Sequence, residues 1–407
     1  MEYNCPYSFL LSNIFMSVWR SEMFIKFIKK EMVLTISFVV ALVSSFFVRP
    51  DMQYIGYIDF RTLSILFMLM LTMAGLQKLG IFKQAGEFLV NKARDTREMI
   101  AILVALSFFS AMVITNDVAL ITFVPFTIIA LGIAGRTDML ILTVVLETIA
   151  ANLGSMLLPI GNPQNLYLYS KAGMSLSQFL GCMLPYSIFA FILLAAVIFV
   201  RADGSGIEKS EKEKFIRTGK EKRLIFVYAL TFVVAILVVV RVIPYEAALA
   251  AVLALVLLFD RETLKKPDYS LLFTFIFLFI FIGNMKRIPA FSNALLSAVN
   301  GNEVVLSVAL SQVISNVPAA ILLSGFTGSY DKLIVGTNFG GLGTLIASMA
   351  SLISFKLYCN TKDANKNKYI LVFTGYNLLF LAALSFARMG ISSGAGRSIM
   401  NSLSFLK

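Results

Sequence analysis

The chain has 407 residues, of which 58% are hydrophobic and only 14% are charged, and its mean hydropathy is +0.84. Because soluble domains carry about 25% charged residues, this chain cannot cover a water-facing surface, and we expect an all-α, polytopic membrane protein. It contains no histidine, which excludes catalytic triads with a histidine base and histidine-ligated zinc sites.

The cysteines and the net charge exclude further classes. Cys5, Cys182 and Cys359 lie far apart and form no C-x-x-C pair, so we expect neither a disulfide framework nor a cysteine-ligated metal. The net charge is +12, but the basic residues cluster in loops between apolar runs. We interpret them as topology signals rather than as a nucleic-acid surface, and we expect no nucleic-acid partner.

Residues 1–30 are predicted to form an interfacial segment that contacts membrane lipid. Its apolar side chains, such as Phe15 and Trp19, come before a basic end at Lys26, Lys29 and Lys30. In a cleaved signal peptide the positive charges come first. We therefore expect a short interfacial helix here.

Nine full spans are predicted along the rest of the chain. A helix needs about 20 apolar residues to cross the hydrocarbon core. Seven candidates are apolar throughout, namely 32–48, 60–76, 176–200, 224–243, 245–259, 269–285 and 369–387. Two more, 139–171 and 333–356, are interrupted by glycine or proline and are predicted to break within the membrane.

Two other apolar regions are predicted to be re-entrant hairpins. Region 101–131 is split by Thr115-Asn116-Asp117, and region 303–325 is split by Ser315-Asn316-Val317-Pro318. Each arm has about 8–16 residues, too short to cross alone. Irregular backbone at this depth persists only when it is buried in protein or lines a wet cavity.

The basic residues orient these spans. A cytoplasmic N-terminus and hairpins that return to their own side put most of the 35 Lys and Arg on the cytoplasmic side. We therefore expect a multi-pass protein of the cell membrane with its N-terminus inside and its C-terminus outside. Residues 201–223 are predicted to be a cytoplasmic linker, and 224–243 a linking span.

The two halves of the chain form a predicted inverted repeat. The first repeat covers 31–200 with an inner hairpin at 101–131, and the second covers 245–390 with an outer hairpin at 303–325. The matching segments are 75–78 with 283–286, 115–116 with 315–316, 152–155 with 338–341 and 161–165 with 347–351. The linking span makes the second repeat start from the opposite side, an arrangement that transporters use for alternating access.

The broken segments carry the predicted chemistry. Free N–H groups at half-helix starts favour anions, and free carbonyls at half-helix ends favour cations. The polar residues beside these breaks are Thr115, Asn116, Asn162, Gln164 and Asn165 in one half, and Ser315, Asn316, Asn338, Thr344 and Ser348 in the other. Two such nests fit one substrate flanked by coupling cations. For any single asparagine, a helix cap or an interhelical hydrogen bond is the alternative.

Two acidic residues are predicted to lie at membrane depth, where an ionisable group is expensive and usually functional. Asp117, at the first break, either binds a cation or proton or caps the helix that follows it. Glu147, in the first arm of a broken helix, either faces the cavity or pairs with a base.

At these residues the chain resembles the ion transporter superfamily of arsenite permeases, related sodium/proton antiporters, citrate transporters and divalent-anion:sodium symporters. The motifs are 114–120, 161–166, 315–317 and the glycine run at 336–343. The resemblance implies a scaffold and an elevator-like transport domain, usually in a homodimer. It implies one sodium- or proton-linked site at Thr115, Asn116 and Gly161, a symmetric site at Ser315, Asn316 and Ala347, and substrate contacts from Asn162 and Ser348.

The chain departs from the dicarboxylate branch, which has Ser-Asn-Thr at both tips. Here the third positions are Asp117 and Val317; a carboxylate repels an anionic substrate, and valine cannot donate a hydrogen bond. The polar residues at the breaks and the resemblance together predict substrate contacts from Thr115, Asn116, Asn162, Ser315, Asn316 and Ser348. Coupling-ion contacts are expected from Asp117, Thr115, Asn116, Gly161, Ser315, Asn316 and Ala347.

These features predict a secondary active transporter for a small anion, a carboxylate or an oxyanion, driven by sodium or protons. The alternative is a sodium/proton antiporter or an arsenite efflux permease that uses Asp117 as the exchanging carboxylate. A channel is disfavoured, because an inverted repeat with two re-entrant hairpins favours alternating access over a continuous pore. An intramembrane enzyme is disfavoured, because we find no second aspartate at membrane depth to pair with Asp117. The chain contains no G-x-x-x-x-G-K-[ST] loop, and we expect no cofactor besides sodium ions.

Overall fold

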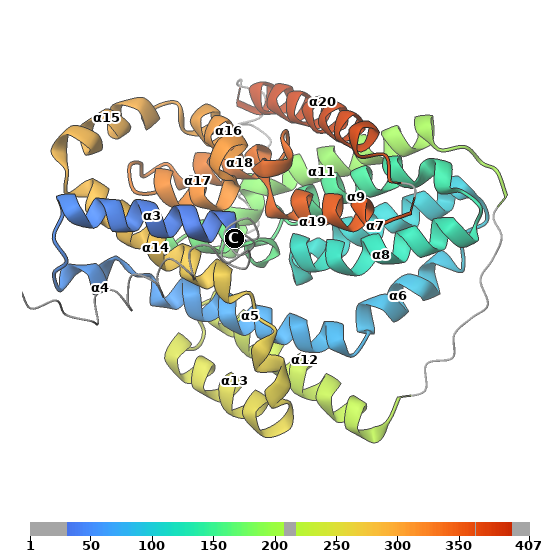
Figure 1. Cartoon of the computed structure of the whole chain (residues 1–407), viewed down its shortest axis with the longest axis horizontal. Helices are drawn as coiled ribbons and strands as arrows, with labels where there is room; N and C mark the ends of the chain where they lie inside the picture. The colour runs from blue at the N-terminus through green and yellow to red at the C-terminus, as the bar shows by residue number, and fades with distance from the viewer. Residues whose placement is uncertain (1–30, 207–216, 363, 393–407) are drawn as a thin grey trace, which may run out of the picture. The chain divides into compact units, whose positions relative to one another are not determined.

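The computed structural model describes residues 31–206, 217–362 and 364–392 (Figure 1). Within these ranges every regular element is a helix, and the pair Asp95 and Gly206 forms an isolated β-bridge. Eight of the described helices are long and apolar enough to cross a membrane. The prediction of an all-α polytopic membrane protein is confirmed, whereas the predicted interfacial segment 1–30 lies outside the described residues.

The helices of the first half run from α3 to α11. Their bounds are α3 Met32–Phe47, α4 Gln53–Tyr57, α5 Phe60–Lys78, α6 Ile81–Val90, α7 Thr96–Ile114, α8 Asn116–Ile133, α9 Leu140–Gly154, α10 Pro163–Ala172 and α11 Leu176–Arg201. The 3₁₀ turns η1 (Thr137–Met139) and η2 (Pro159–Gly161) precede α9 and α10.

The helices of the second half run from α12 to α20. Their bounds are α12 Gly219–Val239, α13 Tyr245–Phe259, α14 Tyr269–Lys286, α15 Pro289–Val299, α16 Glu303–Ile314, α17 Asn316–Leu323, α18 Tyr330–Gly340, α19 Met349–Cys359 and α20 Lys366–Ser392. The 3₁₀ turns η3 (Arg261–Lys265) and η4 (Leu345–Ala347) precede α14 and α19.

The chain divides into two compact units, and the smaller consists of residues up to Ile58 together with Asp268–Ile288. Its helices α3 and α14 pack along each other, and Asn284 on α14 donates to Ser44 Oγ at 2.9 Å and to Tyr54 Oη at 2.8 Å. Gly283 lies under the ring of Tyr57, which a Cβ would approach to 2.2 Å. A glycine and a buried amide thus fix the packing of this unit.

The larger unit comprises Asp59–Pro267 and Pro289–Lys407, and α9 lies at its centre. Figure 1 shows α7, α8, α9 and α19 side by side. Every residue of α9 from Thr143 to Gly154 is buried, as expected for a helix that is apolar on all sides. A Cβ on Gly154 would lie 2.0 Å from the backbone oxygen of Phe108, so glycine is needed for α7 and α9 to pack this closely.

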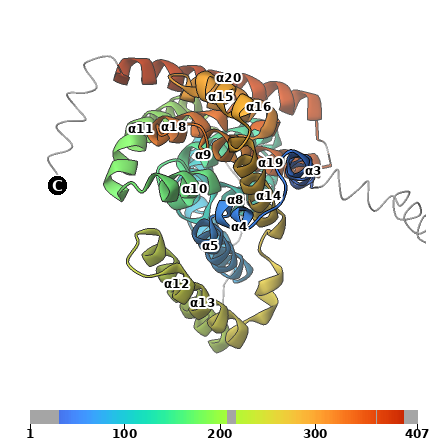
Figure 2. The same cartoon turned by 90° about the vertical axis from the view of Figure 1, so that its left-hand side faces the viewer.

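Helices α5, α12 and α13 also pack together in the larger unit, as Figure 2 shows. Gly75 on α5 lies under the ring of Tyr228 on α12, which a Cβ would approach to 2.1 Å. At the end of α5, Lys78 forms an ion pair with Asp260 at 2.9 Å. The segments 75–78 and 283–286, matched in sequence, therefore both use a glycine to contact a tyrosine ring.

An arginine clamp joins the ends of three helices of the larger unit. Arg136 forms ion pairs with Asp203, at 2.6 Å, and with Asp138, at 3.0 Å, and also donates to Thr96. The hydrogen bond from Arg136, and to a lesser extent the one from Ser205, lowers the pKa of the exposed Asp203 carboxyl group to about 2. The clamp thereby fixes the start of α7, the loop before α9 and the residues that follow α11.

The helices differ from the predicted spans in two respects. The arms of the first hairpin, α7 and α8, have 19 and 18 residues and are each long enough to cross a membrane. The prediction began the first arm at residue 101. Helix α7 already starts at Thr96, where Asp95 caps the helix by accepting a hydrogen bond from the Glu98 N–H. In addition, α6 and α15 lie outside the predicted spans and hairpins, and α15 meets α16 at a bend of 113°.

Candidate functional site

The two predicted tips have the same backbone conformation. Thr115 has φ 74° and ψ 152°, and Ser315 has φ 71° and ψ 156°. In each case one residue ends a helix and the next residue begins another. This region of φ and ψ belongs essentially to glycine and costs about 1–3 kcal/mol for other residues. Two strained tips at matched positions are evidence of a functional constraint rather than of chance similarity.

The broken helix of the first half is stabilised by its own asparagines. Asn162 accepts from the Asn165 N–H at 2.9 Å and so caps α10, whose first residue is Pro163. The Asn162 and Asn165 amides also donate to the free carbonyl of Ser155. A Cβ on Gly161 would lie 2.1 Å from the same carbonyl oxygen, so Gly161 allows the backbone to fold back on itself.

The broken helix of the second half uses a different device. Gln312 on α16 donates to the carbonyls of Gly340 and Leu342, at 3.1 and 3.0 Å, where α18 ends. Gly343 has φ 111°, and a Cβ there would lie 2.2 Å from Gln312 Oε1. Thr344 donates its N–H to Gln312 Oε1 at 2.9 Å. The role of Gln312 was missed in the sequence, because it depends on a loop that only the folded chain forms.

Five asparagines, which we call the asparagine cluster, join the two halves at the breaks. They are Asn116, Asn152, Asn162, Asn165 and Asn338, each at most 5% exposed. Asn162 donates to Asn338 at 3.1 Å, and Asn338 donates to Asn165 at 2.6 Å. Asn116 donates to Asn152 at 3.1 Å. Hairpin tip and broken helices are thus connected through side-chain amides.

Ser348, at the start of α19, contacts the asparagine cluster from the second half. Its hydroxyl donates to Asn152 Oδ1 at 2.9 Å, and Asn152 in turn donates to Ser351 at 3.3 Å. In the sequence, Asn152 served only as evidence for the repeat. Its match with Asn338, each two residues before a glycine of its break, was the signal that pointed to a shared role.

The remaining predicted residues occupy the two tips. The Ser315 hydroxyl lies 3.4 Å from the Ala347 carbonyl and 3.5 Å from Asn316 Oδ1. Asn316 is 4% exposed, and its Nδ2 lies close to Gly341. Thr115 is half-buried at the other tip. The structure therefore places every predicted contact residue at a tip or at a helix break.

The two tips differ at one matching position, which is Asp117 in the first and Val317 in the second. Asp117 lies half-buried in the first turn of α8, and its N–H donates to Asn116 Oδ1 at 3.0 Å. Val317 is buried in the first turn of α17. The first tip thus carries a carboxylate next to the asparagine cluster, and the second carries a hydrocarbon side chain at the matching position.

Four helices begin at these breaks, namely α8, α10, α17 and α19. The unpaired N–H groups of a helix start give it a partial positive charge that favours anions. Among the described residues no group of three or more Cys, Asp or Glu side chains could hold a metal ion. Any cation bound here would have to use hydroxyl, amide and backbone oxygens, with Asp117 as the nearby carboxylate.

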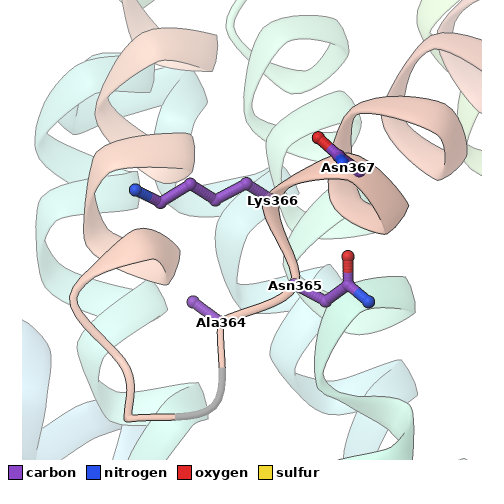
Figure 3. A pocket seen from close by; sticks show the side chains of 4 residues that line it. All are labelled: Ala364, Asn365, Lys366 and Asn367. Atoms are coloured by element: carbon purple, nitrogen blue, oxygen red, sulfur yellow. The ribbon is translucent and has the colours of Figure 1, made fainter.

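A hollow beside the loop between α19 and α20 is separate from these residues (Figure 3). It has a volume of about 440 Å³ and is lined by Ala364, Asn365, Lys366 and Asn367. The polar side chains point in different directions in Figure 3. Asn365 accepts from the Lys368 N–H at 3.0 Å and so caps α20. We assign this loop a structural role.

The membrane helices and the buried polar cluster define a multi-pass membrane transport protein. The model of the citrate transporter family matches residues 22–329, and the chain belongs to this family. It is 34% identical to an uncharacterized transporter of Methanocaldococcus jannaschii over 75% of this chain and 83% of that protein. It is 30% identical to the inner membrane protein YbiR of Escherichia coli over 74% and 80% of the two chains.

A more distant similarity reaches plants. The chain is 25% identical to the silicon efflux transporter LSI3 of Oryza sativa subsp. japonica over 172 residues, which is 41% of this chain and 34% of that protein. The predicted resemblance to the ion transporter superfamily is confirmed by these matches. Both family and relatives are transporters, which points to a protein that is not an enzyme.

Proposed function

We propose that the chain moves a small anion, a carboxylate or an oxyanion, across the cell membrane by using a sodium or proton gradient. The observation that carries this proposal is that the starts of α10 and α19, one from each half, are both bonded to the asparagine cluster. Asn162 caps α10, and Ser348 at the start of α19 donates to Asn152. Helix starts and amide donors together bind an anion without the cost of burying lysine or arginine.

The tips are the proposed coupling-ion sites. At the second tip the Ser315 hydroxyl lies within hydrogen-bonding range of both Asn316 Oδ1 and the Ala347 carbonyl. Oxygen atoms of this kind, at unwound helix ends, bind sodium in transporters. At the first tip Thr115, Asn116 and Gly161 are the corresponding residues, and Asp117 adds a carboxylate that takes a cation or a proton.

We propose alternating access of the elevator type in a homodimer, with the N-terminus cytoplasmic and the C-terminus outside. Elevator transport requires that the whole binding site travel with one body. The asparagine cluster and both tips belong to the same compact unit, which supports this mechanism. The matching strained tips support a pair of symmetric ion sites within that unit.

Sodium/proton antiport, or efflux of arsenite, is the second candidate. The observation that favours it is Asp117, which lies beside Asn116 where the other tip has a buried valine. A carboxylate at that position exchanges a proton for a cation and does not favour an anion as its neighbour. The name of the rice relative, a silicon efflux transporter, supports an uncharged or weakly acidic oxygen compound as cargo.

Uptake into proteoliposomes tests the proposal. The purified chain is reconstituted, an inward sodium gradient or pH gradient is imposed, and labelled citrate, succinate, sulfate and arsenite are offered in turn. We expect one of these solutes to accumulate above its external concentration. Movement that only equalises the concentrations, regardless of either gradient, contradicts coupled transport. Ion exchange without movement of any solute in the panel supports the antiporter instead.

One variant tests the site in this experiment, and a second serves as its control. Asn116→Ala removes an amide of the cluster and is expected to abolish accumulation. Asn293→Ala removes an exposed amide on α15 and is expected to leave uptake unchanged. Equal loss in both variants indicates damaged protein rather than a damaged site.

A further inference from the structure

Glu147 is a buried acid that the proposed site does not use. It lies in the middle of α9 and is 0% exposed. Its Oε1 atom accepts from Thr127 Oγ1 on α8 at 2.8 Å and from Ser107 Oγ on α7 at 3.3 Å. Its Oε2 atom is buried and has no hydrogen-bond partner. In the described part of the chain, no lysine or arginine forms an ion pair with it.

These contacts require a neutral side chain. An ionised carboxylate needs a cation or several donors to compensate for its lost hydration. Two hydroxyl groups on one oxygen do not provide this, and the second oxygen has none. A carboxylic acid with its proton on Oε2 keeps Oε1 as the acceptor that Thr127 and Ser107 need. It then leaves a neutral O–H without a partner instead of a charge, which costs far less.

The second half of the chain shows that packing alone does not call for an acid here. Asn152 matches Asn338, so the position that matches Glu147 is Leu333. Leu333 lies on α18, is 0% exposed and packs in the same way against the hairpin helix α16. Ser107 likewise matches Ser307, which donates to the carbonyl of Glu303 on its own helix. A leucine therefore fills the equivalent site, and the acid is a property of the first half alone.

Glu147 is linked to the first tip by the helices that surround it. It lies five residues before Asn152, about 7.5 Å along α9, and Asn152 accepts from Asn116 at the tip. Its two hydroxyl partners belong to α7 and α8, the arms that end in that tip. Any movement of the tip relative to α9 therefore changes the surroundings of the carboxyl group.

No other ionisable side chain contacts Glu147 in the described residues. On α20 the Tyr369 hydroxyl is electrostatically influenced by Glu147 and bonds through Ser354 to Thr148, the residue next to Glu147. The other charged or titratable side chains on the elements packed against α9 are Arg97, Glu98, Asp117, Asp138, Cys182, Tyr186, Arg201, Lys356, Tyr358, Cys359, Lys366, Lys368, Tyr376 and Arg388.

We propose that Glu147 is a proton-binding site that couples the transport cycle to the pH gradient. The carboxylate takes up one proton in the state that admits water to α9 and carries it as the neutral acid in the state described here. The proposal rests on the proposed transport function for its coupling role. Proton binding itself does not depend on which solute is moved.

Infrared spectroscopy of the reconstituted protein tests proton binding without any substrate. We expect the C=O stretch of a protonated carboxyl group in the wild type at neutral pH, lost in Glu147→Gln and weakened when the pH is raised. Glu303→Gln is the matched control, because Glu303 is 2% exposed but has Lys332 at 3.6 Å. Absence of a band that depends on Glu147, or a band that persists unchanged at every pH at which the protein stays folded, overturns the proposal.

Transport tests the coupling role. A gradient of one pH unit can drive up to about tenfold accumulation per coupled proton. Glu147→Gln, which imitates the neutral acid, should lose this accumulation and its pH dependence but keep the exchange of labelled for unlabelled solute. Glu147→Leu, which copies Leu333, should do the same, and Glu303→Gln should resemble the wild type.

The outcomes separate the two proposals. If the wild type moves no solute of the panel, the proposed function fails, and the infrared band still decides whether Glu147 binds a proton. Accumulation by Glu147→Gln with the pH dependence of the wild type overturns the coupling role. So does a wild type that responds to sodium gradients and not at all to pH gradients.

Discussion

Asn338 forms two hydrogen bonds between the two halves, as many as Asn152 does. It accepts from Asn162, donates to Asn165 and donates to the Ile334 carbonyl on its own helix. Asn338→Ala removes one hydrogen bond from each of two buried amides, Asn162 and Asn165, and each such loss costs about 1–3 kcal/mol. We expect the variant to be less stable by about 2–4 kcal/mol and inactive.

Thermal unfolding in detergent measures the stability of this variant. Asn293→Ala, on the exposed face of α15, serves as the control and should change stability by less than about 0.5 kcal/mol. Comparable stability of the two variants indicates that the Asn338 contacts contribute little to the fold.

Asp117 has two possible roles that one substitution separates. Asn also caps helices well, so Asp117→Asn keeps the start of α8 intact while removing the negative charge. If Asp117 couples transport to an ion, the variant should lose gradient-driven accumulation, and its residual flux should not depend on pH or sodium. A variant that still concentrates solute with normal ion dependence leaves Asp117 only a capping role. The measurement is the proteoliposome assay described above.

The two tips combine a strained backbone with the proposed ion contacts. At the conformation of Thr115, any Cβ is strained, and glycine relieves the strain. We expect Thr115→Gly to be more stable than Thr115→Ala by about 1–2 kcal/mol, because the two variants lack the same hydroxyl and differ only in the Cβ. Both should transport poorly, since both lose a proposed ion contact.

A control on the neighbouring helix shows which of glycine and alanine is more stable where the backbone is not strained. At Ala119, buried within α8, glycine should be less stable than alanine by about 1 kcal/mol, the usual order in a helix. If Thr115→Gly and Thr115→Ala unfold at the same temperature, the tip is not strained in the membrane.

The contact between α7 and α9 depends on one glycine. Gly154→Ala would put a Cβ 2.0 Å from a backbone oxygen of Phe108, and backbone cannot move aside as a flexible side chain can. We expect a loss of about 3 kcal/mol or more, in the upper range for single substitutions. Gly132→Ala on α8 meets nothing within 4 Å and should be stabilising by up to about 1 kcal/mol. Thermal unfolding of the two variants tests both signs.

The elements also show what the sequence could and could not predict. Apolar length identified six of the eight described helices that are long enough to span a membrane, but predicted α7 and α8 only as shorter hairpin arms. The positions of glycine, asparagine and proline located both tips and both breaks. Helices α6 and α15 were missed, because they are short and contain charged or polar residues that favour a loop by composition. The contacts of Gln312 and Asn152 were missed because residues distant in sequence supply their partners.

At the scale of the whole chain, the predicted repeat has similar backbone and different chemistry in its two halves. The tips share one strained conformation, and the breaks share a glycine and a capping position. Yet Asp117 matches Val317 and Glu147 matches Leu333, so the acid at the tip and the acid within α9 both belong to the first half. We infer that the first half carries the proton-linked chemistry and that the second half keeps a hydroxyl and amide site suited to sodium.

The topology of the two hairpins leads to the last prediction. Helices α7 and α8 are each long enough to cross the membrane, so the tip at Thr115 lies either at mid-depth, as predicted, or at the far surface. Cysteines at Thr115 and Ser315 distinguish these arrangements in a background without Cys5, Cys182 and Cys359. Re-entrant hairpins predict that a membrane-impermeant maleimide reaches Thr115→Cys only in some states of the transport cycle, so that its labelling depends on solute and on ion gradients.

Ser315→Cys should behave in the same way, and both labelling rates should change when a transported solute or an ion gradient is present. Lys92→Cys and Asn293→Cys, at exposed positions predicted to lie on the cytoplasmic and outer sides, report on each side independently of transport. Constant labelling of Thr115→Cys from outside means that α7 and α8 both span the membrane. In that case the first tip is a surface loop, and the symmetric ion sites proposed here cannot both open by alternating access.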